Sequence, residues 1–176
     1  MIENVNKISI IGGSGTGKTT LANNLSKQLN LPAYHIDGMH HLDNWQIRDK
    51  AERDKIILEK ASEEKWIIDG TYRSTLEHRL ECADLIIYLD YSSLAQIKGI
   101  LGRYIKEHGK ERPEIPGCKE RMTLEFLEQT WNWRKNKRKF IIDKINKIDN
   151  HKVLIFKNRK QLNKWYKNEF NKNIIS

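Results

Sequence analysis

The segment Gly12–Thr19 (G-G-S-G-T-G-K-T) constrains the fold of this chain more than any other feature. It fits the pattern G-x-x-x-x-G-K-[ST], a loop whose glycines let successive backbone N–H groups point at phosphate oxygens. A short apolar run at residues 7–11 precedes the loop and predicts a buried strand. Residues 19–29 follow it with leucines at every fourth position, which predicts a helix. Strand, glycine loop and helix are therefore in the order that this phosphate-binding loop (P-loop) requires, and the helix N-terminus adds positive charge.

The P-loop is predicted to bind a nucleoside triphosphate. Lys18 would reach the β and γ phosphates, and the Thr19 hydroxyl would ligate Mg²⁺. We therefore expect ATP and Mg²⁺ as cofactors. The alternative, a glycine turn with a surface lysine, is disfavoured by the flanking strand and helix. The expected nucleotide-binding residues are Gly12, Gly13, Ser14, Gly15, Thr16, Gly17, Lys18, Thr19, Thr20 and, after the last predicted strand, Arg159.

Apolar runs alternate with amphipathic segments along the chain, and this alternation predicts a parallel sheet covered on both faces. Strands are expected at residues 7–11, 33–37, 65–69, 85–90 and 153–156. Helices are expected at residues 19–29, 48–64, 74–82, 94–107, 121–148 (with a break near Trp133) and 159–170. Residues 109–117 are expected to form a mobile loop. The predicted fold is one α/β domain over residues 1–176, a three-layer P-loop NTPase fold with a five-stranded parallel sheet flanked by helices.

Charge is distributed unevenly along the 176 residues. Residues 1–97 contain 11 Lys and Arg against 14 Asp and Glu, whereas residues 98–176 contain 21 against 9. The basic half can bind nucleic acid or a phosphate-rich small molecule. The sequence has no apolar run of membrane-spanning length, no signal-peptide pattern and no metal-type cysteine spacing. We expect a cytoplasmic protein without a membrane partner, and both a monomer and a homodimer fit the sequence.

Three carboxylates stand where predicted strands end, which is where ligands gather in parallel sheets. Asp69 closes an apolar run and is followed by Gly70, which allows close backbone approach to a ligand. We assign Asp69 to the Mg²⁺ shell, with a helix N-cap as the alternative. Asp90 closes a similar run, but the Y-S-S that follows favours a capping turn before a helix. Asp37 is predicted to orient or deprotonate the acceptor hydroxyl or to contact a Mg²⁺-bound water, with a turn residue as the alternative.

Several arginines follow the predicted strand ends or flank the loop at residues 109–117. The planar fork of arginine matches phosphate oxygens in two-point contacts, so at least three of these side chains should face phosphate. The candidates are Arg48, Arg73, Arg79, Arg103, Arg112 and Arg121.

Residues 35–45 contain three histidines and a tryptophan. A metal site of His35, His40, His41 and Asp43 is the weaker interpretation, because the spacing matches no structural zinc pattern. His40 and His41 either line a substrate pocket or are packed or solvated histidines without a functional role. Trp45 either stacks on a base or sugar or caps the core. The substrate-binding candidates, besides Asp37 and the arginines, are His41, Trp45, Gly70 and Tyr72.

The segment Trp131–Lys139 interleaves two tryptophans with five cations. Stacking together with phosphate contacts would make it a nucleic-acid surface. We favour the alternative, an amphipathic helix whose two tryptophans pack inward while its lysines face water. Nucleic acid is therefore a partner that the sequence leaves open but does not favour.

Taken with the P-loop, the run W-I-I-D-G-T-Y-R-S-T resembles the small P-loop kinases of the adenylate kinase-like group. In adenylate kinases the third strand ends in Asp-Gly followed closely by Arg, as at Asp69, Gly70 and Arg73, although Thr71-Tyr72 replaces the usual aromatic–proline pair. A closer resemblance, up to about residue 160, is to the bacterial DNA topology modulation proteins. It rests on His35-Ile36-Asp37, Trp45 with Arg48, Asp69-Gly70-Thr71-Tyr72, Gly109-Lys110-x-Arg112-Pro113 and Trp131-Asn132.

The resemblance implies that the Asp69 strand lies beside the P-loop strand and that residues 98–121 form a lid. Arg103, Arg112 and Arg121 would be the lid arginines, neutralising charge on the transferred phosphate. The resulting hypothesis is a phosphotransferase in which Lys18, Asp37, Asp69, Arg73 and the lid arginines are catalytic. Arg48, Arg73 and Arg79 would bind a small acceptor. The second hypothesis is a nucleic-acid-associated ATPase or regulator, as the family name suggests.

Overall fold

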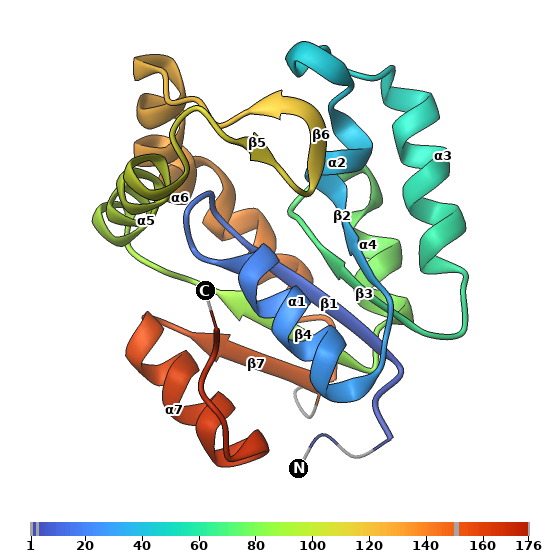
Figure 1. Cartoon of the computed structure of the whole chain (residues 1–176). Helices are drawn as coiled ribbons and strands as arrows, with labels where there is room; N and C mark the ends of the chain where they lie inside the picture. Colours follow the sequence, from blue (N-terminus) through green and yellow to red (C-terminus); the bar gives the residue numbers. More distant parts are fainter. Residues whose placement is uncertain (1, 3, 150–151, 176) are drawn as a thin grey trace.

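β1 (Lys7–Gly12) lies at the centre of a five-stranded parallel sheet with strand order β2-β3-β1-β4-β7 (Figure 1). The structure, a computed structural model, describes residues 2, 4–149 and 152–175. The other strands are β2 (Ala33–His35), β3 (Trp66–Asp69), β4 (Leu85–Leu89) and β7 (Val153–Phe156). β3 and β4 are buried along their whole length, because helices cover both faces of the sheet and leave no strand face for polar residues. The predicted five-stranded parallel sheet is confirmed.

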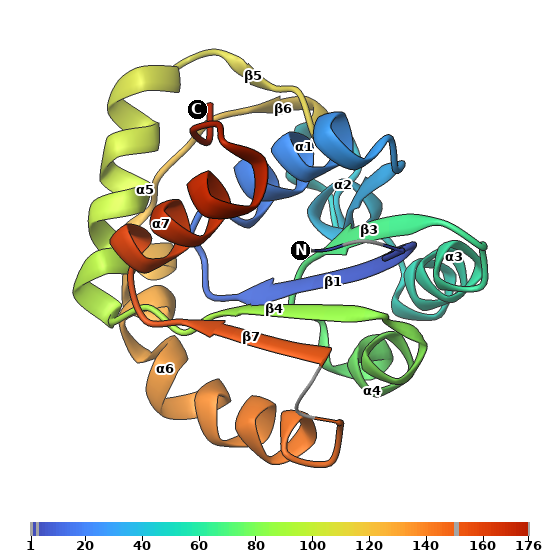
Figure 2. The ribbon, with the colours of Figure 1, turned by 90° about the horizontal axis from the view of Figure 1, so that it is seen from below.

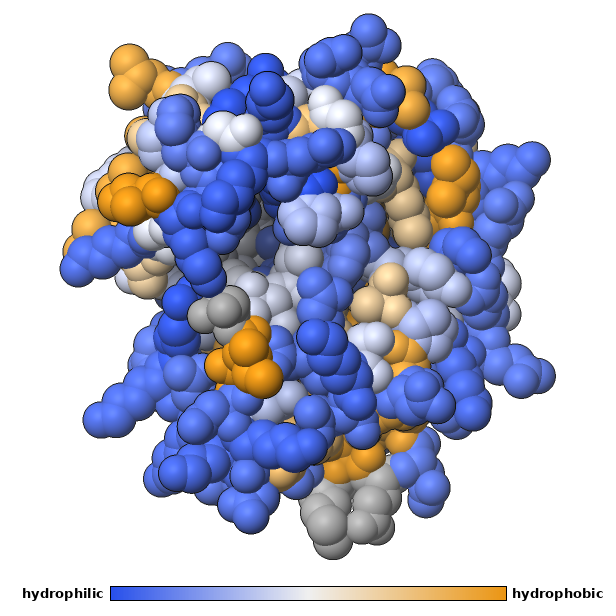
Figure 3. Space-filling view, in the orientation of Figure 1, coloured by the Kyte–Doolittle hydropathy of each residue, from blue (hydrophilic) through white to orange (hydrophobic). Residues whose placement is uncertain are grey.

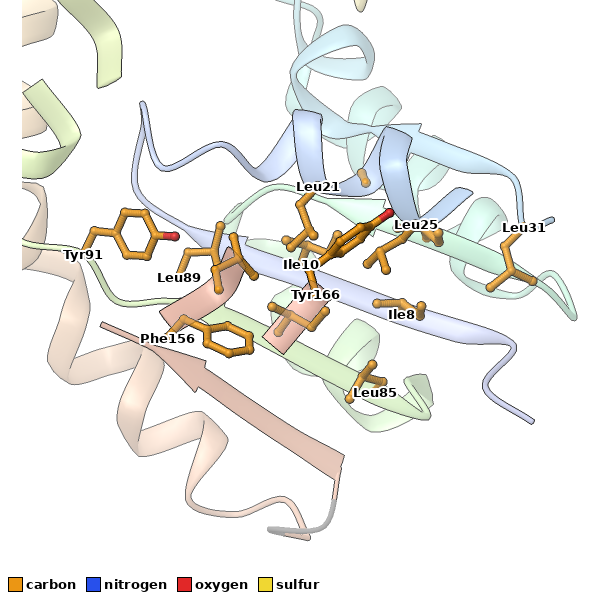
Figure 4. Close-up of a cluster of buried hydrophobic side chains, with 14 residues drawn as sticks. Ile8, Ile10, Leu21, Leu25, Leu31, Leu85, Leu89, Tyr91, Phe156 and Tyr166 are labelled. Atoms are coloured by element: carbon orange, nitrogen blue, oxygen red, sulfur yellow. The ribbon is translucent and has the colours of Figure 1, made fainter. Parts of the chain in front are cut away.

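Helices form a layer on each face of the sheet (Figure 2). One face is covered by α1 (Lys18–Leu29) and α7 (Arg159–Phe170), and the other by α3 (Lys50–Ala61), α4 (Arg73–Cys82) and α6 (Leu124–Ile145). Figure 4 shows the core on the first face, where Leu21 and Leu25 of α1 pack with Tyr166 of α7 on Ile8 and Ile10 of β1. The leucine stripe that predicts α1 is the stripe that this core buries.

Polar side chains cap four helices at their N-termini, which explains where these helices begin. Asp49 accepts hydrogen bonds from two backbone N–H groups of α3, and Asn158 accepts one from α7. Ser92 caps α5 (Ser93–Glu107), and Thr123 caps α6. The capping role predicted for Asp90 is therefore wrong, because Ser92 occupies that position. α6 is also continuous, without the break expected near Trp133.

The segment between α5 and α6 is a β-hairpin, so the expectation of a loop without strands at residues 109–117 is wrong. β5 (Glu111–Arg112) pairs antiparallel with β6 (Ile115–Lys119). The hairpin packs on α2 (Ile36–His40) and on the single turn η1 (Asp43–Trp45), both of which follow β2. The expected strand at residues 33–37 accordingly ends at His35, and Asp37 lies in the first turn of α2.

Asp90, just beyond β4, is a buried carboxylate that binds three cations. Its oxygens lie 3.0 Å from Arg138, 3.4 Å from Arg134 and 2.7 Å from Lys157. Burial by itself raises the pKa of Asp90, but the hydrogen bonds from Arg138 and Lys157 outweigh it and hold the pKa below its usual value. Asp90 therefore ties α6 to the segment after β7.

Replacing Asp90 by Asn should destabilise the protein by about 2 kcal/mol at pH 7, since half-exposed cations recover part of their hydration. A lowered pKa gives a stability contribution that is present above the unfolded-state pKa and is lost as pH falls through the folded-state pKa. The difference between wild type and variant, measured by urea unfolding, should therefore shrink at about pH 3. An equal difference at both pH values would contradict this assignment.

Within the residues described, no helix combines the length and the apolar character needed to cross a membrane.

Candidate functional site

The P-loop connects β1 to α1 and is held by hydrogen bonds at both ends. The Gly12 N–H donates to Thr71 Oγ1, and the Thr71 hydroxyl donates back to the Gly12 carbonyl, each at 2.9 Å. Farther along, Thr16 Oγ1 and Lys18 Nζ both donate to the Gly13 carbonyl, at 2.9 and 3.0 Å. Gly17 precedes the helix with a φ of 89°, a backbone conformation that glycine adopts without strain. The loop is therefore preformed as a cradle of backbone groups.

The outer side of the P-loop rests on α5. A Cβ atom placed on Gly99 of α5 would overlap the carbonyl oxygen of Gly15, so the two backbones touch. Gln96, one turn earlier, is fully buried beside the loop and donates to the Tyr91 carbonyl at 3.1 Å. α5 thus carries both the seat of the phosphate loop and, at Arg103, one of the predicted ligand arginines.

A cleft of about 1040 Å³ opens above the P-loop, between α1, α2, α5 and the hairpin. Among the predicted site residues, the cleft is lined by Gly12, Ser14, Gly15, Gly17, Lys18, Thr19, Thr20, Asp37, His41, Trp45, Gly70, Tyr72, Arg103, Arg112, Arg121 and Arg159. Gly13 and Thr16 lie behind this surface, with Thr16 buried. The structure therefore gathers most of the predicted nucleotide and acceptor residues in one cavity.

Lys18 lies between two carboxylates and two arginines. Burial lowers the pKa of the Lys18 ammonium, the charges of Asp37 and Asp69 raise it, and those of Arg103 and Arg112 lower it again. The net direction is downward. A partly buried cation that lines the cleft, with nearby carboxylates and only a carbonyl hydrogen bond, is suited to receive an anionic ligand, whose charge would stabilise it.

Asp69 ends β3 directly beside β1, opposite Ile10. Its carboxylate is 3% exposed and does not line the cleft, because Oδ2 lies 2.8 Å from Nδ1 of His35. The other nitrogen of His35 lies 3.1 Å from Asn23 Oδ1 on α1. Burial lowers the pKa of His35, but the hydrogen bond and charge of Asp69 raise it above its ordinary value, which favours an ionic pair. His35 is a partner of Asp69 that the sequence did not reveal.

Asp37 and Tyr72 face each other across the acceptor side of the cleft, with the Tyr72 hydroxyl 3.5 Å from Asp37 Oδ1. Burial raises the pKa of Tyr72, and the charge of Asp37 adds to this, so the phenol stays protonated. Arg53 lies over the Tyr72 ring, 4.9 Å from its centroid, and its Nη1 is 3.3 Å from Nδ1 of His40. Burial lowers the pKa of His40, and the charges of His41 and Arg53 lower it further, which favours a neutral ring that accepts this bond.

Trp45 forms an aromatic wall of the cleft. Its indole N–H donates to the Lys119 carbonyl at 3.1 Å, and Arg121 lies over its ring at 4.5 Å. Among the described residues, Arg121 has no carboxylate partner. Trp45 also adopts a φ of 63°, in the left-handed region where bulky residues are uncommon. The indole lines the cleft and belongs to neither hydrophobic core, so it does not cap the core, and stacking on a base or sugar stays a prediction.

Glu120 connects the other two lid arginines. Its side chain is 1% exposed, with Oε1 3.0 Å from Nε of Arg103 and Oε2 3.6 Å from Nε of Arg112. Glu120 Oε2 has no hydrogen-bond partner. Because Arg103 lies on α5 and Arg112 on the hairpin, Glu120 joins the two walls of the cleft. A carboxylate next to Arg121 is the only sequence signal that could have suggested this role.

Replacing Glu120 by Ala should loosen the hairpin without unfolding the sheet, because it leaves two arginines without their shared counter-charge. We expect backbone amides at residues 111–119 to exchange with solvent at least about tenfold faster, while β1 and β4 amides keep their protection. Hydrogen exchange followed by mass spectrometry measures both regions in one sample. Unchanged exchange in the hairpin would show that Glu120 does not hold it.

Three of the predicted arginines are not brought to the cleft. Arg48 donates to the Met39 carbonyl at 2.9 Å and pairs with Glu52 on the protein surface. Arg73 is exposed and lies 4.0 Å above the Phe140 ring. Arg79 is 0% exposed and donates to the carbonyl oxygens of Gly70 and Tyr72, at 3.1 and 3.4 Å. The prediction that Arg79 binds the acceptor is wrong, because its buried guanidinium forms hydrogen bonds to the loop after β3.

The basic segment of α6 is amphipathic, but only one of its tryptophans packs inward. Trp133 packs against the second hydrophobic core and also borders the cleft, whereas Trp131 is 56% exposed. The inward orientation predicted for Trp131 is therefore wrong. Two of the five cations, Arg134 and Arg138, are paired with Asp90.

The histidines do not converge on a metal site, since the described residues contain no group of three or more His, Cys, Asp or Glu placed to bind one.

Comparison with known proteins agrees with this architecture. The family of ATPases associated with various cellular activities (AAA) matches residues 8–77, from β1 into α4. The uncharacterized protein YqaC of Bacillus subtilis (strain 168) is 28% identical over 123 residues, which cover 69% of this chain and 68% of that protein.

Two solved structures share the fold. A gluconokinase from Sinorhizobium meliloti 1021 superposes with a TM-score of 0.52 and 16% identity, over 88% of this chain and 83% of its own. A shikimate kinase from Aquifex aeolicus vf5 superposes with a TM-score of 0.51 and 16% identity, over 94% of this chain and 99% of its own. The chain therefore shares its P-loop kinase-like fold with these two structures.

Proposed function

We propose that this chain is an ATP- and Mg²⁺-dependent phosphotransferase acting on a small acceptor. The observation that carries the proposal is one cleft with two chemically different sides. One side has the P-loop with Lys18, and the other has Asp37, Tyr72 and the Trp45 wall. A nucleotide-binding protein without transfer chemistry would need no second polar site facing the phosphate loop.

On the donor side, Lys18 and the loop amides would bind the β and γ phosphates, and Arg159, whose Nη2 lies near Gly17, would bind the nucleotide on its outer side. The oxygen donors Thr19 and Asp69 fit Mg²⁺, which prefers hard oxygen ligands and retained water molecules. Thr19 lines the cleft, and Asp69 lies one strand away behind it, suited to holding a metal-bound water. When bound, Mg²⁺ would offset phosphate charge.

On the acceptor side, Asp37 would orient the acceptor hydroxyl and accept its proton, while Tyr72 donates a hydrogen bond. Arg121 would bind an anionic group, because it lines the cleft and no carboxylate in the described part of the chain occupies it. Residues 98–121 would act as the lid, with Arg103 and Arg112 placed toward the transferring phosphate. One domain over residues 1–176 would carry the whole activity.

The test is an ATP-consumption screen with Lys18→Ala as the blank. Gluconate and shikimate, suggested by the names of the two fold neighbours, belong in the screen beside nucleosides, nucleoside monophosphates and other sugar acids. Acceptor-dependent ADP formation that is absent in the blank supports the proposal. ADP formation that no acceptor stimulates and that Lys18→Ala retains would refute it.

A nucleic-acid-associated ATPase is the second candidate, favoured by exposed Trp131 beside Lys135 and Lys139 and by the resemblance to DNA topology modulation proteins. Pairing of Arg134 and Arg138 with Asp90 weakens this candidate, because those cations are already neutralised in part. The measurement is DNA affinity at several salt concentrations, with Lys135, Lys137, Arg138 and Lys139 neutralised as the comparison. No DNA binding at low salt would eliminate this function.

A further inference from the structure

α5 and α6 carry half of the large hydrophobic side chains that are exposed in the described part of the chain. We call this set the α5–α6 face; its members are Leu94, Leu101, Ile105, Leu124 and Trp131, between 38% and 86% exposed. Hydrophobic surface is visible over these helices at the left of Figure 3. A concentration of exposed large apolar residues on two neighbouring helices is a feature of interaction surfaces.

Helical spacing places these residues in one stripe on each helix. On α5, Leu101 and Ile105 follow Leu94 by seven and eleven positions. All three side chains therefore lie on one side of that helix. On α6, Leu124 and Trp131 share a side with Glu128 and Lys135 at the same spacing. The two helices are in contact, and α6 runs obliquely away from α5 (Figure 2). The Ser93 hydroxyl donates to the Trp131 carbonyl at 2.7 Å, which joins the stripes at one end.

Charge on the α5–α6 face is arranged symmetrically about Trp131. Glu128 lies three residues before it and Lys135 four residues after it, and both are exposed. Neither has an ion-pair partner among the described residues. If a second α6 crosses antiparallel at Trp131, each Glu128 meets the Lys135 of the other copy. A two-fold interface requires this kind of self-complementary pattern.

We infer that the α5–α6 face binds a second copy of this chain, with the two α6 helices antiparallel and their Trp131 side chains at the centre. Tryptophan at the middle of an interface, with aliphatic residues around it and charges at the rim, is the arrangement that contributes most binding energy. Nucleic acid fits this face less well, because Glu128 and the aliphatic residues of α5 offer nothing to phosphate. This inference concerns a surface outside the cleft and does not depend on the proposed phosphotransfer.

The experiment is sedimentation equilibrium of the full chain up to about 1 mM, the weak end of specific association. Wild type should approach twice the 20.8 kDa mass of one chain. Trp131→Glu should be monomeric. Glu128→Lys and Lys135→Glu should each weaken association at least about tenfold, and the double swap should restore it, because attraction returns with the signs exchanged. Leu58→Glu on α3, 38% exposed on another face, is the matched control and should associate as wild type.

Monomeric wild type at all concentrations would overturn the inference. So would a dimer that survives Trp131→Glu, or a double swap that fails to restore association. Far-UV circular dichroism and thermal melting of each variant separate a lost interface from a lost fold. A monomeric wild type that binds duplex DNA, with binding abolished by Trp131→Glu, would assign the face to nucleic acid instead.

Discussion

Lys18→Ala is expected to lower ATP turnover about a thousandfold, because it removes the cation predicted to stabilise charge on the transferring phosphate. The fold should survive, since the carbonyl of Gly13 keeps its hydrogen bond from Thr16 and α1 keeps its buried leucines. His35 also remains beside Asp69 when the lysine charge is lost. The measurement is steady-state turnover with the best acceptor of the screen, together with a thermal melt.

Lys98→Ala is the matched control for Lys18, because Lys98 also lines the cleft but projects from α5. It removes the same charge from the same cavity without touching the P-loop. We expect its turnover to fall far less than that of the Lys18 variant. Equal losses would mean that only the summed charge of the cleft matters. A folded Lys18→Ala variant that turns over ATP at the wild-type rate would contradict the phosphotransferase proposal.

Arg79→Ala should cause the largest loss of stability, about 3 kcal/mol, or about 9 °C in Tm for a chain of this size. The substitution leaves a buried cavity and removes the donors for the Gly70 and Tyr72 carbonyls. Burial lowers the pKa of Arg79 to about 10, an effect that the charge of Asp69 opposes, so the guanidinium stays charged at neutral pH. Urea unfolding at pH 7 measures the change.

Arg73→Ala, six residues earlier on the same helix, is the control for Arg79. Its guanidinium is exposed and stacks on Phe140, so its removal should cost less than about 1 kcal/mol. Arg79→Lys should recover only part of the stability, because one ammonium cannot reproduce the fork that reaches two carbonyls. If Arg79→Ala were as stable as Arg73→Ala, the loop after β3 would keep its conformation without the hydrogen bonds from Arg79.

The order of strands and helices follows from periodicity, because each element buries a face that repeats in the sequence. The P-loop is likewise predictable, since glycine spacing is a local feature. The position of the Asp69 strand beside β1 follows only from the family resemblance, and the structure confirms it. The contacts that the arginine side chains make cannot be predicted from the sequence. A long arginine side chain can turn in several directions from the same kind of position. The Arg48 side chain lies at the surface, that of Arg73 stacks on an aromatic ring, and that of Arg79 enters the core.

The same reason explains the functional partners that sequence reasoning missed. Arg53 and Glu120 are ordinary charged residues in charged segments, and only tertiary packing brings one to His40 and the other to Arg103. The hairpin at residues 111–119 resembles a loop in sequence, because both strands are short and β6 contains a proline and a glycine. Trp131 was expected inside because hydrophobicity alone cannot tell a core from an exposed patch.

The contact between Gly15 and Gly99 fixes the middle of α5 against the P-loop. With the two backbones touching, this part of the helix cannot swing without carrying the phosphate loop along. Gly102, by contrast, has open space around it, and Arg103 follows directly. Any rearrangement of Arg103 and the hairpin would therefore have to pivot beyond Gly99, while the first half of α5 and the P-loop keep their positions.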